Sequence, residues 1–242
     1  MVDWLMRTRL LLGSDAIETL AKSRVAVFGI GGVGGYAAEA LARSGVGAID
    51  LVDSDEIGET NINRQIVATT SAIGKLKADA MAERIADINP RCDVRPHRCF
   101  YLPASKGDLD FREFDYIVDA VDTVTAKLQL MQDAQAAGVP IISSMGTANK
   151  LDPTALKVAD ISETSICPFA RIIRKECRKR GIEGVKVVYS TEPPRRPVEE
   201  VGLEDDALRP GRRDVPGSTA FVPPAAGLII AAEVVRDLTG VR

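Results

Sequence analysis

A glycine-rich run near the N-terminus has the spacing of a phosphate-binding loop. Gly29, Gly31 and Gly34 satisfy the pattern G-x-G-x-x-G, and Gly32 adds a fourth glycine. Glycines at these positions permit a tight turn, let the backbone approach a phosphate and allow a helix to pack closely on a strand. Free N–H groups at the start of the following helix attract an anion. The run therefore predicts a nucleotide site.

The polar residues that follow favour a nucleoside triphosphate over NAD. Asp53 ends the next apolar run, where an acid that holds a ribose hydroxyl is expected. Arginine and lysine neutralise phosphate charge, and a carboxylate holds Mg²⁺ through oxygen, whereas NAD carries only a pyrophosphate and needs no metal. The pattern G-x-x-x-x-G-K-[ST] is absent, which excludes a P-loop NTPase. The further candidate site residues are Asp55, Asn61, Arg64, Gln65, Lys77 and Asp122.

Parallel strands would bring these separated residues together. Apolar runs predict strands at 25–28, 48–52, 115–119 and 139–143, and helices at 16–21, 36–44, 70–88 and 124–138, with Thr70 as the N-cap of the third helix. Strands that alternate with helices predict an α/β fold, a Rossmann-like doubly wound sheet that is mainly parallel. The carboxyl ends of such strands converge on the ligand crevice.

The C-terminal third has a different pattern. Strands are expected at 155–158 and 185–189, a basic helix at 169–180 and a final apolar helix at 225–238, while 192–218 is a long loop without periodicity. We expect one nucleotide-binding domain over residues 1–242. Its nucleotide-binding core covers 7–150, and a substrate-facing C-terminal extension covers 151–242.

Composition excludes several classes of protein. The 242 residues carry 31 Lys and Arg against 34 Asp and Glu, so a net charge of -3 leaves nucleic-acid binding to a local basic patch. With one His, and four Cys that form no C-x-x-C pair, neither zinc nor a disulfide framework is expected. No signal peptide is visible, and the longest apolar stretch, 221–232, is too short to span a membrane, so we expect a cytoplasmic protein.

The motifs over residues 7–150 together resemble the ubiquitin-activating-enzyme superfamily, which includes the adenylyltransferases of molybdopterin and thiamine biosynthesis. The resemblance implies that a carboxylate attacks the α-phosphorus of ATP, so that an acyl-adenylate forms and pyrophosphate leaves. It also implies a homodimer and these roles: Asp53 on the ribose, Asn61, Arg64 and Lys77 on the phosphates, Asp122 on Mg²⁺, and Arg7 on the ATP of the partner subunit.

The C-terminal third resembles the tRNA threonylcarbamoyladenosine dehydratases. The similar stretches are 146–154 (GTANKLDPT), 160–164 (DISET), 168–171 (PFAR) and 217–223 (GSTAFVP). The zinc-binding C-x-x-C pairs common in the adenylyltransferases are absent. The resemblance implies that the threonine carboxylate of the modified adenosine next to the anticodon is adenylated. The ureido group then closes on it to form a hydantoin and release AMP.

Other interpretations remain open. The basic helix either contacts tRNA or is a solvated face; the candidate contacts are Arg171, Arg174, Lys175 and Arg178, and the second interpretation places Ile172, Ile173 and Cys177 inward. The acceptor could instead be the C-terminus of a small ubiquitin-like or sulfur-carrier protein, and a sulfur-transfer or other protein partner is conceivable. An NAD-dependent oxidoreductase and a non-catalytic nucleotide-binding partner are the alternatives of other classes.

Three single residues also have two interpretations. Cys167 either reacts covalently or is a small core residue, and the second is the commoner fate of a cysteine. Asp119 either positions Asp122 or only ends its strand. Lys75 is expected to face solvent, which leaves Lys77 as the phosphate ligand.

Overall fold

The computed structural model describes residues 3–102, 109–198 and 216–241, so most of the predicted loop 192–218 lies outside the described residues. Seven strands form one sheet in the order β3-β2-β1-β4-β5-β7-β6, parallel except for the β6–β7 pair. The predicted α/β class with a mainly parallel sheet is confirmed. The strands are β1 (Arg24–Phe28), β2 (Ala48–Val52), β3 (Asp93–His97), β4 (Tyr116–Asp119), β5 (Ile141–Ser144), β6 (Leu156–Asp160) and β7 (Lys186–Ser190).

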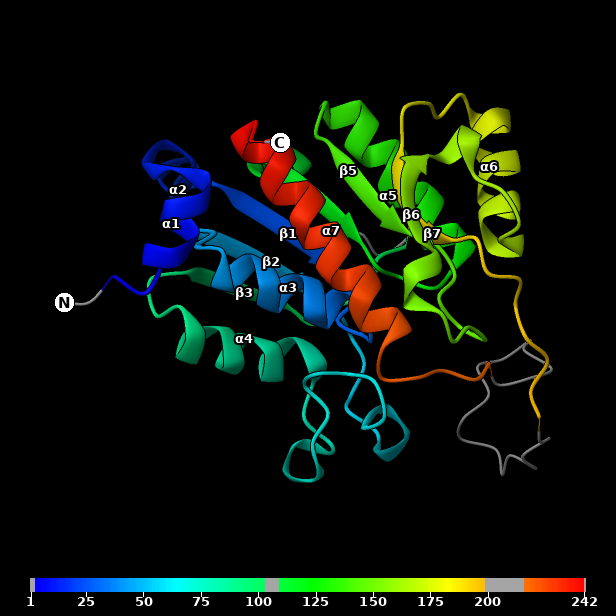
Figure 1. Cartoon of the computed structure of the whole chain (residues 1–242), viewed down its shortest axis with the longest axis horizontal. Helices are drawn as coiled ribbons and strands as arrows, with labels where there is room; N and C mark the ends of the chain where they lie inside the picture. The colour runs from blue at the N-terminus through cyan, green and yellow to red at the C-terminus, as the bar shows by residue number, and fades with distance from the viewer. Residues whose placement is uncertain (1–2, 103–108, 199–215, 242) are drawn as a thin grey trace.

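Helices cover both faces of the sheet (Figure 1). On one face α3 packs against α4 and α7, and α2 packs against α7; on the other face α5 packs against α6. The helices are α1 (Met6–Leu12), α2 (Ser14–Lys22), α3 (Gly34–Arg43), α4 (Lys77–Ile88), α5 (Val124–Ala137), α6 (Pro168–Arg180) and α7 (Val222–Thr239). None of the helices in the described part of the chain is long and apolar enough to cross a membrane.

The central strand β1 shows why the sheet has helices on both sides. Val25 and Val27 belong to the core under α3 and α7, whereas Ala26 and Phe28 belong to the core under α5. All four are fully buried. A strand that must be apolar on both faces requires a covering layer on each, which is typical of parallel sheets.

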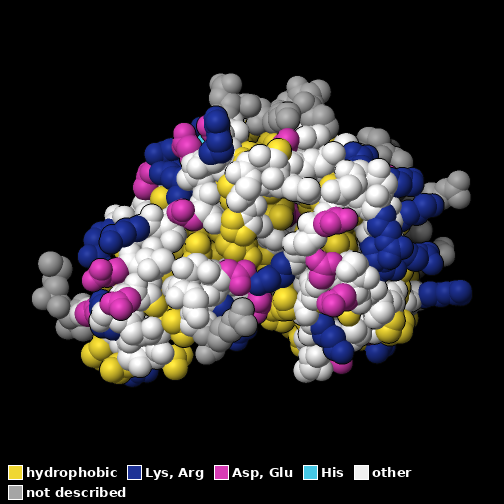
Figure 2. Space-filling model, turned by 90° about the horizontal axis from the view of Figure 1, so that it is seen from above, with side chains coloured by type: hydrophobic (Ala, Val, Ile, Leu, Met, Phe, Trp, Pro, Cys, Tyr) yellow, Lys and Arg dark blue, Asp and Glu magenta, His cyan; other side chains and the backbone are white. Residues whose placement is uncertain are grey.

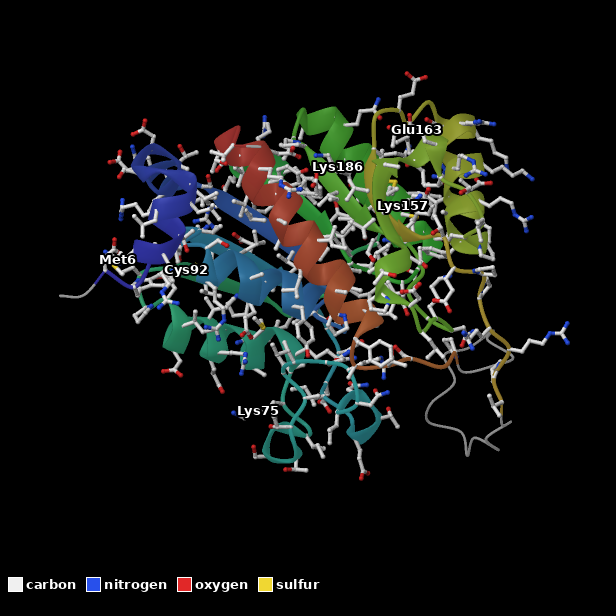
Figure 3. All side chains as sticks on the ribbon, in the orientation of Figure 1. Met6, Lys75, Cys92, Lys157, Glu163 and Lys186 are labelled. Atoms are coloured by element: carbon white, nitrogen blue, oxygen red, sulfur yellow. The ribbon has the colours of Figure 1, made fainter. Side chains whose placement is uncertain are left out.

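The last helix, α7, returns to the nucleotide-binding half of the chain. A Cβ on Gly227 would lie 2.3 Å from the carbonyl oxygen of Val33, so glycine allows α7 to approach α3 closely. Toward the C-terminal end of α7, Glu233 and Asp237 form ion pairs with Lys186 of β7. Lys186 is labelled in Figure 3. The C-terminal third is therefore joined to the same sheet and core as the first 150 residues.

The prediction of a helix from Thr70 to residue 88 was wrong at its start. Thr70–Ala72 is a single 3₁₀ turn, and α4 begins only at Lys77. Gly74 interrupts the helix because its φ of +83° is left-handed. The segment before α4 instead pairs Leu76 with Glu56 in an isolated antiparallel bridge.

β3 and α1 were not predicted from the sequence. β3 is the edge strand beside β2; its residues are exposed or half-buried, and it contains Pro96, so it lacks the apolar pattern of an inner strand. The seven-residue α1 has no buried residue, so no apolar periodicity marks it. The final helix begins three residues before the predicted position because Pro223 and Pro224 fit its first turn.

Candidate active site

A cleft of about 1500 Å³ lies at the carboxyl ends of the central strands. Phe28, Val52, Ala120 and Ser144 line it, each at or directly after the end of a strand. The strand order reverses between β1 and β4, and in open α/β sheets ligands bind in the crevice at such a switch point. The topology therefore predicts a ligand site at this cleft.

At two of the four predicted glycines, a neighbouring backbone atom is so close that no side chain could fit. Gly29 has a φ of +86°, and a Cβ there would lie 2.8 Å from the carbonyl oxygen of Ala120. A Cβ on Gly34 would lie 1.8 Å from the carbonyl oxygen of Gly29, which is a steric impossibility. The turn thus brings the start of α3 directly onto the end of β1.

The other two glycines expose their backbone to the cleft. Gly31 and Gly32 both line the cleft. The nearest atom to a Cβ on Gly31 would be the Nε2 of Gln65 at 4.0 Å, so this backbone is accessible to a ligand. A Cβ on Gly32 would lie 3.2 Å from Pro223 and 3.4 Å from Arg64, which shows that both side chains border the glycine loop.

Asp53 lies at the end of β2 with its carboxylate turned toward the loop. It accepts the N–H of Ile30 at 2.6 Å and the N–H of Asp55 at 2.8 Å. Burial raises the pKa of Asp53, and the nearby Lys77 ammonium partly opposes that shift. Lys77 is buried at the start of α4 and donates to the Asp55 carboxylate at 2.8 Å. The two acids and the lysine line the cleft together.

The segment after the 3₁₀ turn Glu59–Asn61 brings Arg64 into the cleft. Its Nη1 donates to the carbonyl oxygen of Thr60 at 2.9 Å and to Oδ1 of Asn63 at 2.8 Å. Burial lowers the pKa of Arg64, and within the described residues no carboxylate forms an ion pair with it. A half-buried guanidinium that has only neutral partners is a strong site for an anionic ligand.

Asn61 and Gln65 complete this segment. Asn61 accepts the N–H of Gly58 through Oδ1 at 3.2 Å and lines the cleft. Gln65 is 7% exposed, and its Oε1 is buried with no hydrogen-bond partner in the described part of the chain. A buried carbonyl oxygen without a donor carries a desolvation cost that a ligand hydroxyl or water would remove.

Asp122 lines the cleft two residues beyond Ala120, on the segment that leaves β4. The neighbouring Asp119 lies at the end of β4 and accepts the N–H of Val121 through Oδ1. Its other oxygen accepts Nζ of Lys127 at 2.8 Å and the hydroxyl of Ser143 at 2.6 Å. Asp119 therefore does more than end its strand, because it holds the backbone next to Asp122.

Lys127 was missed by the sequence analysis. Its side chain is fully buried, as is that of Asp119. Burial lowers the pKa of the Lys127 ammonium, and the Asp119 carboxylate opposes the shift. A lysine is rarely fully buried unless it is paired, and its partner Asp119 lies on another element, so no local signal distinguishes it. Its role appears only when α5 packs beside the ends of β4 and β5.

Arg7 and Lys75 lie away from the cleft, whereas Cys167 lines it. Arg7 is exposed on α1 and is not among the residues that line the cleft. Lys75, labelled in Figure 3, pairs with Glu83 and is half exposed, as expected for a lysine that faces solvent. Cys167 is 2% exposed and also lines the cleft, so it is both a core residue and a neighbour of the site.

Of the four candidate tRNA contacts on the basic helix α6, one is bonded within the protein and three are exposed to solvent. Arg174 donates to the hydroxyl of Thr164 at 2.6 Å and is therefore held inside the protein. Arg171, Lys175 and Arg178 are exposed, and no ion pair of theirs is found among the described residues. Figure 2 shows Lys and Arg side chains gathered at the end of the molecule where α6 lies. The spacing i, i+4, i+7 places the three on one face of the helix.

The interpretation of α6 as a solvated face placed Ile172, Ile173 and Cys177 inward, and two of these three residues are buried. Ile173 and Cys177 are buried, and Cys177 contacts Met131 of α5. Ile172 is 48% exposed, so its predicted inward position was wrong. It is one position away from Ile173, and a rotation of about 100° between consecutive helix residues turns it toward solvent.

The remaining part of the cleft lies beyond the nucleotide motifs. It is formed by the segment after β5, the start of α6 and the segments on either side of the undescribed residues 199–215; the lining residues include Met145, Gly146, Thr147, Asn149, Lys150, Cys167, Phe169, Pro194, Pro197, Pro216 and Ser218. We call these residues the acceptor half of the cleft. Within the described residues, no group of three or more His, Cys, Asp or Glu side chains could hold a metal ion by itself.

Comparison with known proteins identifies the family. The sequence profile of the ThiF family matches residues 5–242, nearly the whole chain. The chain belongs to the ThiF family. Among ThiF relatives, the tRNA threonylcarbamoyladenosine dehydratase of Bacillus subtilis (strain 168) is 46% identical over 243 residues, which cover 98% of this chain and 95% of that protein. The dehydratase of Escherichia coli (strain K12) is 38% identical over 193 residues, 76% of this chain and 72% of that protein.

The fold of this ThiF protein is also that of a solved dehydratase. The crystal structure of E. coli tRNA N6-threonylcarbamoyladenosine dehydratase in complex with ATP matches it with a TM-score of 0.82 and 32% identity, over 97% of this chain and 93% of that chain. The same protein in complex with AMP matches with a TM-score of 0.83. The resemblance inferred from the motifs is thereby confirmed for both parts of the chain.

Proposed function

We propose that this protein is an ATP-dependent tRNA threonylcarbamoyladenosine dehydratase. The similarity to named dehydratases extends over both the nucleotide motifs and the C-terminal third. The observation that carries the proposal is Arg64, a half-buried cation without a carboxylate partner in the described residues, at the glycine loop of a cleft that continues into a separate acceptor half. One cleft with these two parts suits the transfer of an adenylyl group to an acceptor.

The predicted residues that line the nucleotide half of the cleft have surroundings that support a role for each. The backbone of Gly29, Gly31, Gly32 and Gly34 lies against the ATP phosphates, and Asp53 holds the ribose. Asn61, Arg64 and Lys77 act on the phosphate groups, with Asp55 holding Lys77 in place, and Gln65 contacts the nucleotide. Cations aimed at the phosphates stabilise the charge that develops at the α-phosphorus and on the departing pyrophosphate.

The reaction requires positioning more than acid–base chemistry. The threonine carboxylate of the substrate is already ionised and attacks the α-phosphorus, so that pyrophosphate leaves and an acyl-adenylate forms. A nitrogen of the ureido group then attacks the acyl carbon, loses its proton and expels AMP, which closes the hydantoin ring. The nucleoside loses one water in total. Because the second step is intramolecular, holding the groups in contact supplies much of the rate.

The donor set of the cleft fits Mg²⁺. This ion is usually held by one or two carboxylates together with substrate phosphates, and Asp122 lies at the carboxyl end of β4 in the same cleft as Arg64. Bound there, Mg²⁺ would neutralise phosphate charge. We propose no zinc, because the described cysteines are not clustered with other metal ligands. Asp119 and Lys127 hold the backbone that carries Asp122.

The tRNA partner fits the exposed basic face of α6. This helix begins at Pro168, which lines the cleft together with the preceding Cys167, and Arg171, Lys175 and Arg178 lie further along it. We propose that these three residues contact the tRNA backbone, while Arg174 supports the fold. The chain acts as one domain over residues 1–242, as a cytoplasmic homodimer in which Arg7 reaches the nucleotide of the partner subunit.

A single assay tests the reaction. Enzyme, Mg-ATP and tRNA that carries threonylcarbamoyladenosine are mixed, and the nucleoside mass is measured after digestion. We expect the loss of one water and the formation of AMP. Arg64→Ala and Asp122→Ala should lower the rate by about 100-fold or more while the chain remains folded. ATP turnover with an unchanged nucleoside would contradict the tRNA substrate and indicate a carrier-protein acceptor.

The basic face has its own test. Neutralising Arg171, Lys175 and Arg178 together should raise KM for tRNA. The slope of log K for tRNA binding against log salt concentration should become shallower by about 2 to 3. The matched control neutralises Lys179 and Arg180, which bond to Glu176 and Gln132. Equal effects of the two sets would show that α6 has no specific RNA face.

A further inference from the structure

Gly217 and Ser218 form a short segment just before α7 that borders the cleft through Ser218, and we call this segment the wall. Ser218 lines the cleft, as do Pro216 and Pro223 on either side of it. Pro223 also borders the phosphate loop, since a Cβ on Gly32 would approach it to 3.2 Å. This wall therefore lies where the nucleotide motifs meet the acceptor half of the cleft.

Asn149 holds the wall from the acceptor side. Its Oδ1 accepts the N–H of Gly217 at 2.7 Å, and its own N–H donates to the carbonyl oxygen of Gly217 at 2.8 Å. The Asn149 carbonyl oxygen accepts the N–H of Arg195 at 2.8 Å, so one residue joins two segments that are distant in the sequence. Its φ of +58° is left-handed, a conformation that asparagine and glycine tolerate best.

Asn63 holds the wall from the nucleotide side. Its Nδ2 donates to the carbonyl oxygen of Ser218 at 3.1 Å, while its Oδ1 accepts Nη1 of Arg64 at 2.8 Å. A carboxamide has a donor and an acceptor in fixed relative positions. The orientation that suits Ser218 is thus also the one that holds the guanidinium of Arg64.

We propose that Asn63 and Asn149 are positioning residues that hold the Gly217–Ser218 wall against the phosphate site and so set where the acceptor carboxylate lies. The inference rests on the proposed function. Attack at the α-phosphorus needs the carboxylate in near-contact, and a displacement of about 1 Å can cost about 100-fold in rate. Asn149 acts on the acceptor alone, whereas Asn63 acts on the acceptor and, through Arg64, on ATP.

The two residues should therefore differ in steady-state kinetics with tRNA and ATP. Asn149→Gly keeps the left-handed backbone and removes only the side-chain bond to Gly217; we expect kcat/KM for tRNA to fall about tenfold with an unchanged KM for ATP. Asn149→Asp retains an acceptor oxygen and should restore most of this loss. Asn63→Ala should impair both substrates.

The double variant distinguishes positioning from two independent substrate contacts. Since both asparagines hold the same wall, Asn63→Ala combined with Asn149→Gly should lower kcat/KM for tRNA by less than the product of the single effects. A multiplicative double variant, or an Asn149→Gly that changes both substrates equally, would overturn the inference. So would an Asn149→Asp that is as impaired as Asn149→Gly.

A matched control is Gln135→Ala. Gln135 also anchors a loop by an amide-to-carbonyl hydrogen bond, to Gly181, but it does not line the cleft. Its kinetic constants should equal those of the wild type, and thermal melting of every variant checks that it is folded. If wild-type enzyme fails to dehydrate the nucleoside, the proposed function fails; if it succeeds and the asparagine variants match it, only the positioning role fails.

Discussion

Replacement of Lys127 by methionine tests the buried ion pair behind Asp122. Lys127 and Asp119 have fully buried side chains, with Nζ 2.8 Å from the carboxylate and 3.1 Å from the hydroxyl of Ser143. Lys127→Met keeps most of the side-chain volume but leaves the carboxylate without its cation. The pair lies in a low-dielectric region, so the remaining charge is expensive.

The expected magnitude follows from that burial. Breaking a buried pair by removing one partner costs about 3–5 kcal/mol in the free energy of unfolding. For a chain of this length each kcal/mol lowers Tm by about 2–4 °C, so Tm should fall by about 6–20 °C. Because Asp119 also accepts the N–H of Val121, the variant should lose part of its adenylation rate at temperatures where it remains folded.

The assay is urea unfolding of the wild type, Lys127→Met, Asp119→Asn and the double variant. The double variant removes both charges, so it should be more stable than the sum of the single losses predicts. Lys157, an exposed lysine of β6 labelled in Figure 3, provides the control: Lys157→Met should change the free energy by about 0.5 kcal/mol or less. The reasoning is refuted if Lys127→Met costs less than about 1 kcal/mol, or if the double variant is as unstable as the sum.

Three further predictions concern the loop, the ribose site and the thiols. Gly34→Ala should abolish ATP binding and lower Tm, because its Cβ would lie 1.8 Å from the carbonyl oxygen of Gly29; calorimetric ATP binding equal to the wild type would contradict the close contact. Burial raises the pKa of Asp53 above the usual range of an Asp, so on acidification its carboxylate is protonated at a higher pH than that of an ordinary Asp. The affinity for adenosine, which has no phosphate to titrate, should begin to fall at that higher pH. An affinity that stays flat down to the ordinary range would show that Asp53 does not bind the ribose as a carboxylate. Burial raises the pKa of Cys92 and of Cys177 to about 11, so both thiols should react slowly with N-ethylmaleimide at pH 8 in the folded protein and rapidly in urea, as followed by mass spectrometry.

The inner strands and the glycine loop were predictable because their signals are local. β1, β2, β4 and β5 are short apolar runs that end at a glycine or a polar residue, and each lies within a residue or two of its predicted range. The edge strand β3 was not predictable in this way, since a half-exposed strand with a proline has no distinctive pattern. The start of α4 was misplaced because the left-handed turn at Gly74 depends on the pairing of residues 56 and 76.

The candidate site likewise has residues that local sequence patterns predict and residues that only tertiary contacts reveal. Its nucleotide half could be listed residue by residue from motif spacing, and Asp53, Arg64, Lys77 and Asp122 do line one cleft. The basic helix was recognised as a whole, but the inward role of Arg174 depends on a contact with Thr164 across a gap of ten residues. Sequence spacing predicts which helix face is charged and does not predict which cation is already bonded within the fold.

By itself the sequence determined the fold class and predicted a nucleotide site, because glycine spacing and strand-end acids act through neighbouring backbone. The adenylating chemistry came from the resemblance of these motifs to a known superfamily. Only the tertiary structure decided that Lys127 neutralises Asp119, that Arg64 lacks a carboxylate partner among the described residues, and that Asn63 and Asn149 meet at Gly217 and Ser218. These contacts join residues 8 to 155 positions apart. Their energies depend on burial and on hydrogen-bond geometry, which the packing of the sheet and its helices creates and which no local pattern encodes.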